Sequence, residues 1–193
     1  MLHLLCAKNV DFLSLFAIII PNLTHNSQLT THNLDKLSML KLDPADRAIL
    51  KHLQTNALLT TKELSEKLNL TYTPVYERVR KLEKEGIIKK YVALIDREKI
   101  GKNLVAFCNV ALKEHTRVIG EAFVNAILSF EEVTECYNIS GEYDFMLKVV
   151  VNDMPQYQRF LMEKLGAINN IGSTHSIFVM SEIKHSTALE IVY

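Results

Sequence analysis

The chain has 193 residues, with 22 Lys and Arg, 22 Asp and Glu, and a formal net charge of zero. This length leaves room for one large or two small domains, and zero net charge at face value argues against a nucleic-acid partner. The charge is uneven, however, because residues 41–100 carry 13 basic and 9 acidic side chains, whereas residues 101–193 carry 7 and 11. Segments of +4 and −4 predict two modules with different partners.

The three cysteines, Cys6, Cys108 and Cys136, form no C-x-x-C pair. An odd count suits a reducing compartment, so we expect a cytoplasmic protein. Cys108 and Cys136 stand among apolar, strand-like residues and are expected to be small core residues. No spacing of Cys and His resembles a zinc site, and the sequence predicts neither a metal nor a cofactor.

The first forty residues differ from the rest, since they hold four charged side chains and the remaining 153 residues hold forty. The apolar run at residues 12–20 is too short to span a bilayer, which needs about 20 residues. A signal peptide is disfavoured, because Lys8 is its one basic residue and no A-x-A-like site follows. We therefore expect no membrane partner. Residues 1–41 are expected to be disordered or a mis-assigned start, with the functional protein beginning near Met39; a surface helix is the alternative.

Patterned sequence begins with two short helices. Asp43 is expected to cap the first of them, whose first residue is Pro44. Thr60 or Thr61 opens the second. The inward-facing residues of both helices, with two flanking leucines, are expected to form one small core: Ile49, Leu50, Leu53, Leu58, Leu64, Leu68 and Leu70.

The third helix carries the most informative pattern. Thr73 is its expected N-cap, Pro74 its first residue, and Gly86 its stop. Apolar residues form one stripe of this helix and cations occupy much of the rest. The DNA major groove accepts a short cationic helix that is held on a scaffold in this way. Residues 42–90 therefore predict a winged or plain helix-turn-helix domain that binds double-stranded DNA.

Two kinds of DNA contact are expected from this helix. Its cations would contact phosphates, which gives affinity and register, and its first residues would face base edges. The candidate DNA-binding residues are Thr71, Tyr72, Thr73, Tyr76, Arg78, Arg80, Lys81 and Lys84. A solvated amphipathic face is the plain alternative for the whole set. Arg78 has a further alternative, in which it pairs with a carboxylate inside the domain.

The period of the pattern changes after this domain. Residues 91–102 are expected to form a linker strand, and residues 103–193 a second domain. Strands are predicted over residues 104–112, 133–140, 145–151 and 173–183, helices over 117–128 and 154–165, and a short edge strand over 189–193. The order β-α-β-β-α-β is that of a ferredoxin-like sandwich, so the predicted fold class is α+β.

A Gly-Glu-Tyr-Asp turn at residues 141–144 lies between two predicted strands. Gly141 allows close backbone approach, and the neighbouring amides could take a carboxylate. Asp144 could hold the ammonium group of a ligand. The alternative is a β-turn whose Asp caps its own backbone.

The chain resembles the leucine-responsive and asparagine-responsive (Lrp/AsnC) regulators of bacteria and archaea in three stretches, LTYTPVYERVRKLEKEGIIKKYVALID, ECYNISGEYDFMLKVVVNDMPQYQRFL and THSIFVMSEIKHS. The resemblance covers residues 42–191. It implies an N-terminal DNA-binding domain, a linker strand, and a C-terminal domain that oligomerises and senses small molecules, often amino acids. It also implies a homodimer that assembles further, commonly to an octamer.

The same resemblance implies an effector cleft between subunits, lined by the turn, the start of the following helix and the final strand. The effector-binding residues implied for this chain are Asn138, Ser140, Gly141, Asp144, Met154, Thr174, Ser176 and Ile177. Apolar strand residues are expected in the core of the domain or in the dimer interface, and the sequence leaves this open for Val105, Phe107, Val149 and Val151.

We therefore expect a sequence-specific DNA-binding transcriptional regulator whose assembly or DNA affinity responds to a small effector, an amino acid, and we expect no enzymatic activity. An architectural DNA-binding protein without an effector is one alternative. A small ferredoxin-like enzyme is another, although the sequence offers no nucleophile–base arrangement, metal-binding spacing or phosphate loop.

Overall fold

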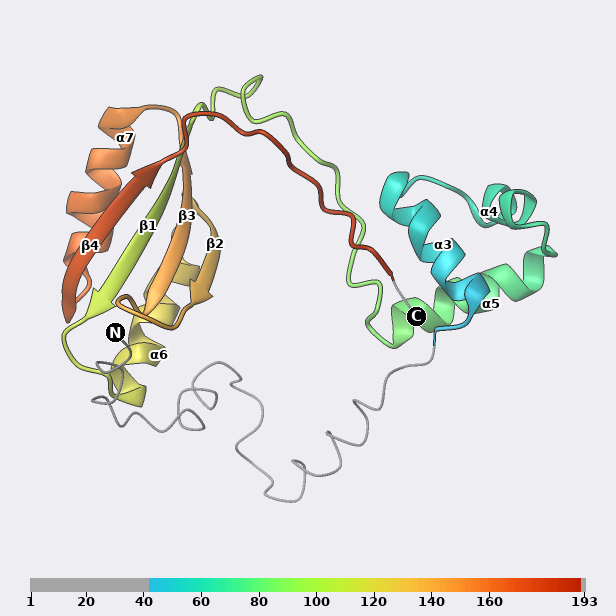
Figure 1. Ribbon diagram of the computed structural model, residues 1–193, viewed down its shortest axis with the longest axis horizontal. Helices are drawn as coiled ribbons and strands as arrows, with labels where there is room; N and C mark the ends of the chain where they lie inside the picture. Colours follow the sequence, from blue (N-terminus) through green and yellow to red (C-terminus); the bar gives the residue numbers. More distant parts are fainter. Residues whose placement is uncertain (1–41, 192–193) are drawn as a thin grey trace, which may run out of the picture. The chain divides into compact units, whose positions relative to one another are not determined.

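The computed structural model describes residues 42–191, which divide into two compact units (Figure 1). Within that range, residues 42–95 and 182–191 form one unit, here called the helical unit, and residues 96–181 form the other, the sheet unit. The expectations for residues 1–41 and for Cys6 lie outside the described residues. Among residues 42–191, no helix combines the length and the apolar character that crossing a bilayer requires.

In its described part, the helical unit contains three α-helices, α3 (Pro44–Thr55), α4 (Thr61–Leu68) and α5 (Tyr72–Lys84). Asp43 caps α3 and Thr60 caps α4, each through a reciprocal capping box with an acidic residue in the first turn, Asp46 and Glu63 respectively. Each box satisfies N–H groups that have no partner within the helix. The predicted starts of these two helices are confirmed.

Helix α5 starts two residues earlier than predicted. Its N-cap is Thr71, and Pro74 is its third residue. A proline fits this position because the first N–H groups of a helix have no partner within it. At the other end, Gly86 has a positive φ of 74°, and the N–H of Ile87 donates to the carbonyl of Leu82 at 3.0 Å. Gly86 therefore ends the helix as predicted.

A small core lies between the three helices. Its buried residues are Ile49, Leu50, Leu64, Val75 and Leu82, and Leu53, Leu59 and Leu68 pack against them. The prediction was wrong for Leu58, which is 89% exposed, and for Leu70, which is 39% exposed. The N–H of Leu58 donates to the side chain of Asn56 in the turn after α3, and the next residue, Leu59, reaches the core instead.

The described part of the sheet unit is a four-stranded antiparallel sheet of order β2-β3-β1-β4, with helices on one face (Figure 1). Its elements are β1 (Leu104–Leu112), α6 (Arg117–Leu128), β2 (Val133–Asn138), β3 (Phe145–Val151), α7 (Met154–Arg159), a π-helical turn η1 (Phe160–Lys164), a 3₁₀ turn η2 (Leu165–Ala167) and β4 (Ile171–Phe178). The predicted β-α-β-β-α-β order and α+β fold class are confirmed.

Several predicted ends differ. Strand β2 is shorter than predicted, β4 starts and ends earlier, and the helix predicted over residues 154–165 changes to π and 3₁₀ geometry after α7. Within the described residues, neither 91–102 nor 189–191 belongs to a strand. The reason for the last difference is long-range, because residues 182–191 pack with the helical unit and not at the edge of the sheet. The expected boundary at residues 103–193 differs from the observed units in this respect.

The two faces of the sheet have different roles. Residues 106, 108, 110 and 112 of β1 face the helices and are buried, together with Leu147, Val149 and Val151 of β3. Cys108 is therefore a core residue, as predicted. Val149 and Val151, for which the sequence left core or dimer interface open, also lie in the core. Cys136 is exposed, contrary to the prediction, because it lies on the edge strand β2, which has a neighbouring strand on one side.

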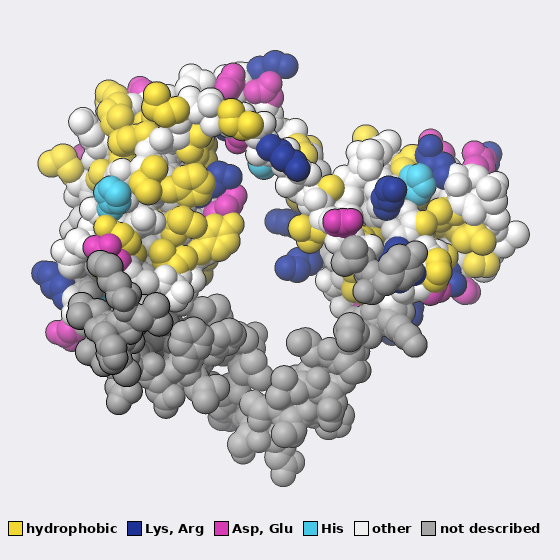
Figure 2. Space-filling model, viewed as in Figure 1, with side chains coloured by type: hydrophobic (Ala, Val, Ile, Leu, Met, Phe, Trp, Pro, Cys, Tyr) yellow, Lys and Arg dark blue, Asp and Glu magenta, His cyan; other side chains and the backbone are white. Residues whose placement is uncertain are grey.

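The face opposite the helices, called the open face below, is largely apolar. Because side chains alternate along a strand, its apolar residues are Val105, which is buried, and Phe107, Ala111, Tyr137, Met146, Val150 and Ile177. The same face also carries Asn109, His175 and the ion pair of Lys148 with Glu135. Tyr137 and Ile177 are 46% and 47% exposed. Figure 2 shows hydrophobic side chains gathered over the strands on this side. An antiparallel sheet can leave one face to water, but such a face is usually polar.

Candidate functional site

The exposed beginning of α5 is the first candidate site. Tyr72 and Tyr76 are 54% and 45% exposed, and their rings stack with centroids 6.1 Å apart and planes 9° apart. Thr71 and Thr73 are exposed beside them, while Val75 holds the opposite side of the helix in the core. The helix thus presents two aromatic and two hydroxyl side chains at the end that helix-turn-helix proteins direct at base edges.

Three predicted cations, Arg80, Lys81 and Lys84, are exposed along the same helix. Nη1 of Arg80 lies 3.7 Å from Oε2 of Glu83, a surface pair that holds the arginine only weakly. Tyr91 donates to the other oxygen of Glu83 at 3.0 Å. Burial and the neighbouring carboxylate raise the pKa of Tyr91 to about 12, so its hydroxyl keeps the proton that it donates. All three cations are placed where a phosphate can reach them.

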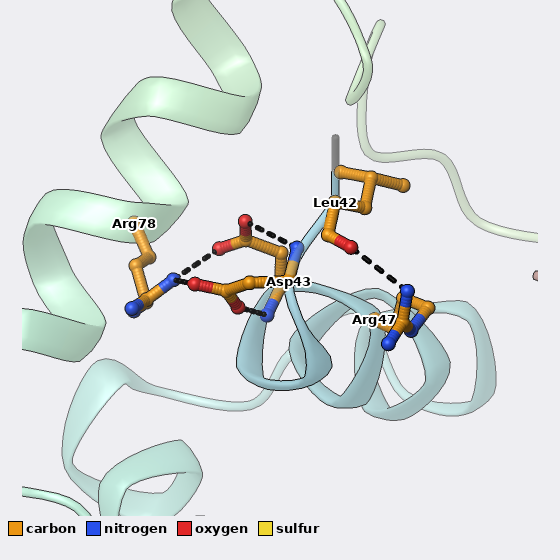
Figure 3. Close-up of polar contacts among 5 residues, drawn as sticks. Leu42, Asp43, Arg47 and Arg78 are labelled. Carbon is orange, nitrogen blue, oxygen red and sulfur yellow. Dashed lines mark hydrogen bonds and ion pairs between the residues drawn. The ribbon is translucent and has the colours of Figure 1, made fainter. Parts of the chain in front are cut away.

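Arg78 lies elsewhere (Figure 3). Its Nη1 donates to Oδ1 of Asp46 at 2.7 Å and also to Asp43, and so ties α5 to the beginning of α3. Asp46 is only 4% exposed. Hydrogen bonds to the two carboxylates raise the pKa of Arg78, and the N–H of Asp46, with Arg78, lowers the pKa of Asp43. The structure therefore places Arg78 in the intradomain ion pair that the sequence left open.

The turn between β2 and β3 is the second candidate site. Oδ2 of Asp144 accepts from the N–H of Leu112 at 2.7 Å, and Oδ1 lies 3.2 Å from Nδ1 of His115. The carbonyl of Asp144 accepts from the N–H of Ile139 and from Nδ2 of Asn138, at 2.9 and 3.0 Å. Asp144 thus anchors the turn to the end of β1, and its side chain remains 27% exposed.

Strand β4 reaches the same end of the sheet. The ring of Tyr143 stacks on His175 of β4, with centroids 6.2 Å apart. The carbonyl of Val110 accepts from the N–H of Asp144 at 2.9 Å, and Val110 pairs on its other side with Thr174. Because neighbouring strands lie about 4.8 Å apart, Asp144 and Thr174 are separated by about 10 Å. Five predicted effector residues therefore lie at this end of the sheet: Asn138, Ser140, Gly141 and Asp144 in or beside the turn, and Thr174 two strands away.

The other three predicted effector residues lie apart from this group. Ser176 faces the helices and accepts from the hydroxyl of Tyr157 at 2.6 Å, and burial raises the pKa of that hydroxyl. Ile177 lies on the open face. Met154 follows the far end of β3, and seven residues at about 3.4 Å each put it about 20 Å from Asp144. One protomer therefore does not bring all eight residues together.

Sequence reasoning missed two neighbours of the turn. His115 lies in the loop between β1 and α6, far from Asp144 in sequence, so no local pattern connects them. Tyr143 is part of the turn itself, but its side chain stacks on His175 of β4, which no local pattern relates to the turn. Both contacts follow from strand pairing, which brings the turn beside β4 and the end of β1.

A pocket of about 430 Å³ lies beside the first half of β4. Its lining includes Lys113, Leu161, Asn170, Ser173 and Thr174. Thr174 is thus shared between this pocket and the group around the turn, and Lys113 adds a positive charge that suits an anionic group.

Two families match the two units. Residues 42–89 match the family described as "Winged helix-turn-helix DNA-binding", and residues 105–189 match the "Lrp/AsnC ligand binding domain". The chain is 37% identical over 150 residues to the leucine-responsive regulatory proteins of Escherichia coli strain K12 and Klebsiella pneumoniae. The alignment covers 78% of this chain and 92% of each relative.

Solved structures give the same result. A transcriptional regulator from Neisseria meningitidis, in complex with L-Met, is 34% identical with a TM-score of 0.74, and the match covers 77% of this chain and 96% of that one. An AsnC family transcriptional regulator from Agrobacterium tumefaciens is also 34% identical, with a TM-score of 0.73 and the same coverage.

Proposed function

Since the chain belongs to the Lrp/AsnC family of transcriptional regulators, we propose that it binds double-stranded DNA in the cytoplasm through α5 and responds to an amino acid. The observation that carries DNA binding is the exposed start of α5 on a helix-turn-helix scaffold. Tyr72, Thr73 and Tyr76 would read base edges, and the cations that follow would contact phosphates. The relatives are regulators, and we assign this chain no catalytic role.

The first experiment measures DNA affinity against salt concentration for the wild-type chain and two variants. In Arg80→Ala, affinity should fall, and the slope of log Kd against log salt should decrease by about one, because one phosphate contact is lost. Lys51→Ala removes an exposed cation from α3, outside the recognition helix, and should leave the slope unchanged. Equal slopes for all three proteins would exclude α5 as the phosphate-binding helix.

We further propose that the working protein is at least a homodimer that pairs through the open face. A second copy would cover Phe107, Met146, Val150 and Ile177, of which one protomer leaves the first three half-buried and Ile177 exposed. A two-fold pair is self-complementary and presents two recognition helices to successive turns of the duplex. One helical unit alone would contact a single half-site weakly. Assembly of such dimers into an octamer is an extension of this proposal.

The proposed effector site uses the turn and β4, with residues of a second copy completing it. The five residues gathered around Asp144 supply an acidic group, backbone amides and small polar side chains, which suit the two charged ends of an amino acid. The apolar residues Met154 and Ile177 lie apart from this group in one protomer. Only a neighbouring subunit can bring such residues to the turn, so the site and the assembly would be coupled.

Thermal melting against the twenty amino acids tests the effector, beginning with L-methionine. A ligand that binds the folded state raises the melting temperature. Asp144→Asn is the informative variant, because Oδ1 of the new amide can still accept from the N–H of Leu112 while the negative charge is lost. Asp144→Ala would also remove this anchor and cost stability. A shift that persists in Asp144→Asn would place the ligand elsewhere; no shift with any amino acid would favour an architectural role.

A further inference from the structure

The last ten described residues return to the helical unit after β4. The ligand-binding family match extends to residue 189, yet residues 182–191 belong to the helical unit. The chain therefore connects the two units twice, once after Ile95 and once before Glu182. The second connection continues directly from β4, which carries Thr174, Ser176 and Ile177.

Two hydrogen bonds dock this segment on α3. Oε1 of Gln54 accepts from the N–H of Leu189 at 2.6 Å, and Nε2 of Gln54 donates to the carbonyl of Leu189 at 3.1 Å. The side-chain amide therefore satisfies both backbone groups of one residue, as a neighbouring strand would. The side chain of Leu189 is 77% exposed, so the backbone and not this side chain is recognised.

Ile191 adds an apolar contact two residues later. It packs against the core cluster that contains Ile49 and Leu50 of α3. The same helix is joined to α5 through the bond of Asp46 with Arg78. A continuous set of contacts thus runs from the C-terminal segment through α3 to the recognition helix.

We propose that the helical unit needs residues 182–191 in order to bind DNA with full affinity. They hold α3, and through α3 they hold α5, in the arrangement that contacts DNA. They also give β4 a direct covalent link to this arrangement, so that a change at β4 reaches α3 without passing through residues 96–103. This inference rests on the proposed DNA-binding function.

Hydrogen exchange of the full-length chain, followed by mass spectrometry without DNA or ligand, tests the docking. Gln54→Ala should speed exchange in residues 182–191 and in α3, by about tenfold at the amide of Leu189. Ile191→Ser should do the same by removing the apolar contact. Thr55→Ala is the matched control, because its exposed hydroxyl bonds only to the carbonyl of Lys51 in its own helix. Unchanged exchange of both segments in Gln54→Ala and Ile191→Ser would overturn the docking.

The proposed role of residues 182–191 in DNA binding is tested by measuring affinity for a duplex of random sequence at low salt. Gln54→Ala and Ile191→Ser should bind several-fold more weakly than the wild type and Thr55→Ala. Equal affinity for all four proteins would overturn the proposed role in DNA binding. A wild-type chain without affinity for DNA would instead refute the proposed function, and the exchange experiment would still decide whether the segment is docked.

Discussion

Arg78 and Arg80 stand two residues apart on α5 and meet different surroundings. Two residues correspond to about 200° around a helix, so the side chains point to opposite sides. Arg78 meets Asp43 and Asp46 of α3, whereas Arg80 faces solvent. Residue type and spacing made both arginines candidates for DNA contact, and only the packing of α3 against α5 separates their roles.

The ion pair predicts a difference in stability between two variants. Arg78→Ala leaves the carboxylate of Asp46 buried without its cation, which should lower the free energy of unfolding by about 2 kcal/mol; the partial exposure of Arg78 keeps the loss below that of a fully buried pair. Arg80→Ala should change it by less than about 0.5 kcal/mol. Urea denaturation followed by circular dichroism compares them. A loss below about 0.5 kcal/mol in Arg78→Ala as well would show that the Arg78 pair adds nothing to stability.

The capping carboxylate of Asp43 predicts a pH dependence. The N–H of Asp46, and then Arg78, lowers the pKa of Asp43 below its ordinary value of 3.8. A lowered pKa means that the charged form stabilises the fold above 3.8, and that this contribution is lost as pH falls through the lower folded pKa. The melting temperature of the helical unit should therefore drop more steeply in the wild type than in Asp43→Asn as the pH falls below 3.8. Asparagine still caps a helix, so this variant isolates the charge. Parallel curves would contradict the assignment.

At the scale of elements, the recognition helix is delimited by features of different kinds. A proline is tolerated anywhere in the first turn, so Pro74 does not fix the first residue: the predicted start was residue 74, and the observed start is residue 72. Its end depends on Gly86, whose φ of 74° is costly for residues with a Cβ. A glycine stop is therefore a sharper signal than a proline start.

Gly86 yields a prediction for this end. A Cβ at Gly86 would have no atom within 4 Å, so Gly86→Ala should cost only the strain of the positive φ, about 1 kcal/mol of unfolding free energy. The last turn, which carries Lys84, should fray, and hydrogen exchange of that turn should increase. Gly86→Asn should recover part of the loss, because asparagine tolerates this conformation better. Identical stability of Gly86→Ala and the wild type would show that the turn relaxes without cost.

At the scale of the whole molecule, the exposed apolar residues of the open face predict a homodimer that pairs through this face. Val150→Glu places a charge in the middle of this face and should lower the mass measured by light scattering to that of a monomer. DNA affinity should then fall by about a hundredfold, because paired sites act together. Val118→Glu is the matched control, since Val118 is an apolar residue, 76% exposed, on α6 at the other side of the sheet. A dimer that persists in a folded Val150→Glu chain would place the interface elsewhere.

Much of the architecture was predictable because its causes are local. Capping residues and apolar periodicity act over a few neighbouring positions, so the bounds of β1, α6 and β3 agree with the sequence prediction to the residue. The alternation in β1 and β3 also marks one buried face. The candidate residues at the start of α5 could also be predicted from the sequence, because a recognition helix exposes its first turn.

The errors arose where a distant segment decides the outcome. Cys136 reads as a core residue, but its strand lies at the sheet edge. Arg78 reads as a phosphate contact, but Asp46 of another helix holds it. The sequence by itself determined the order of elements, the apolar faces and the cationic helix. Only the tertiary structure decided which carboxylate binds Arg78, what holds Asp144 in place, and that the C-terminal segment docks on α3, because each of these contacts joins residues that no local pattern relates.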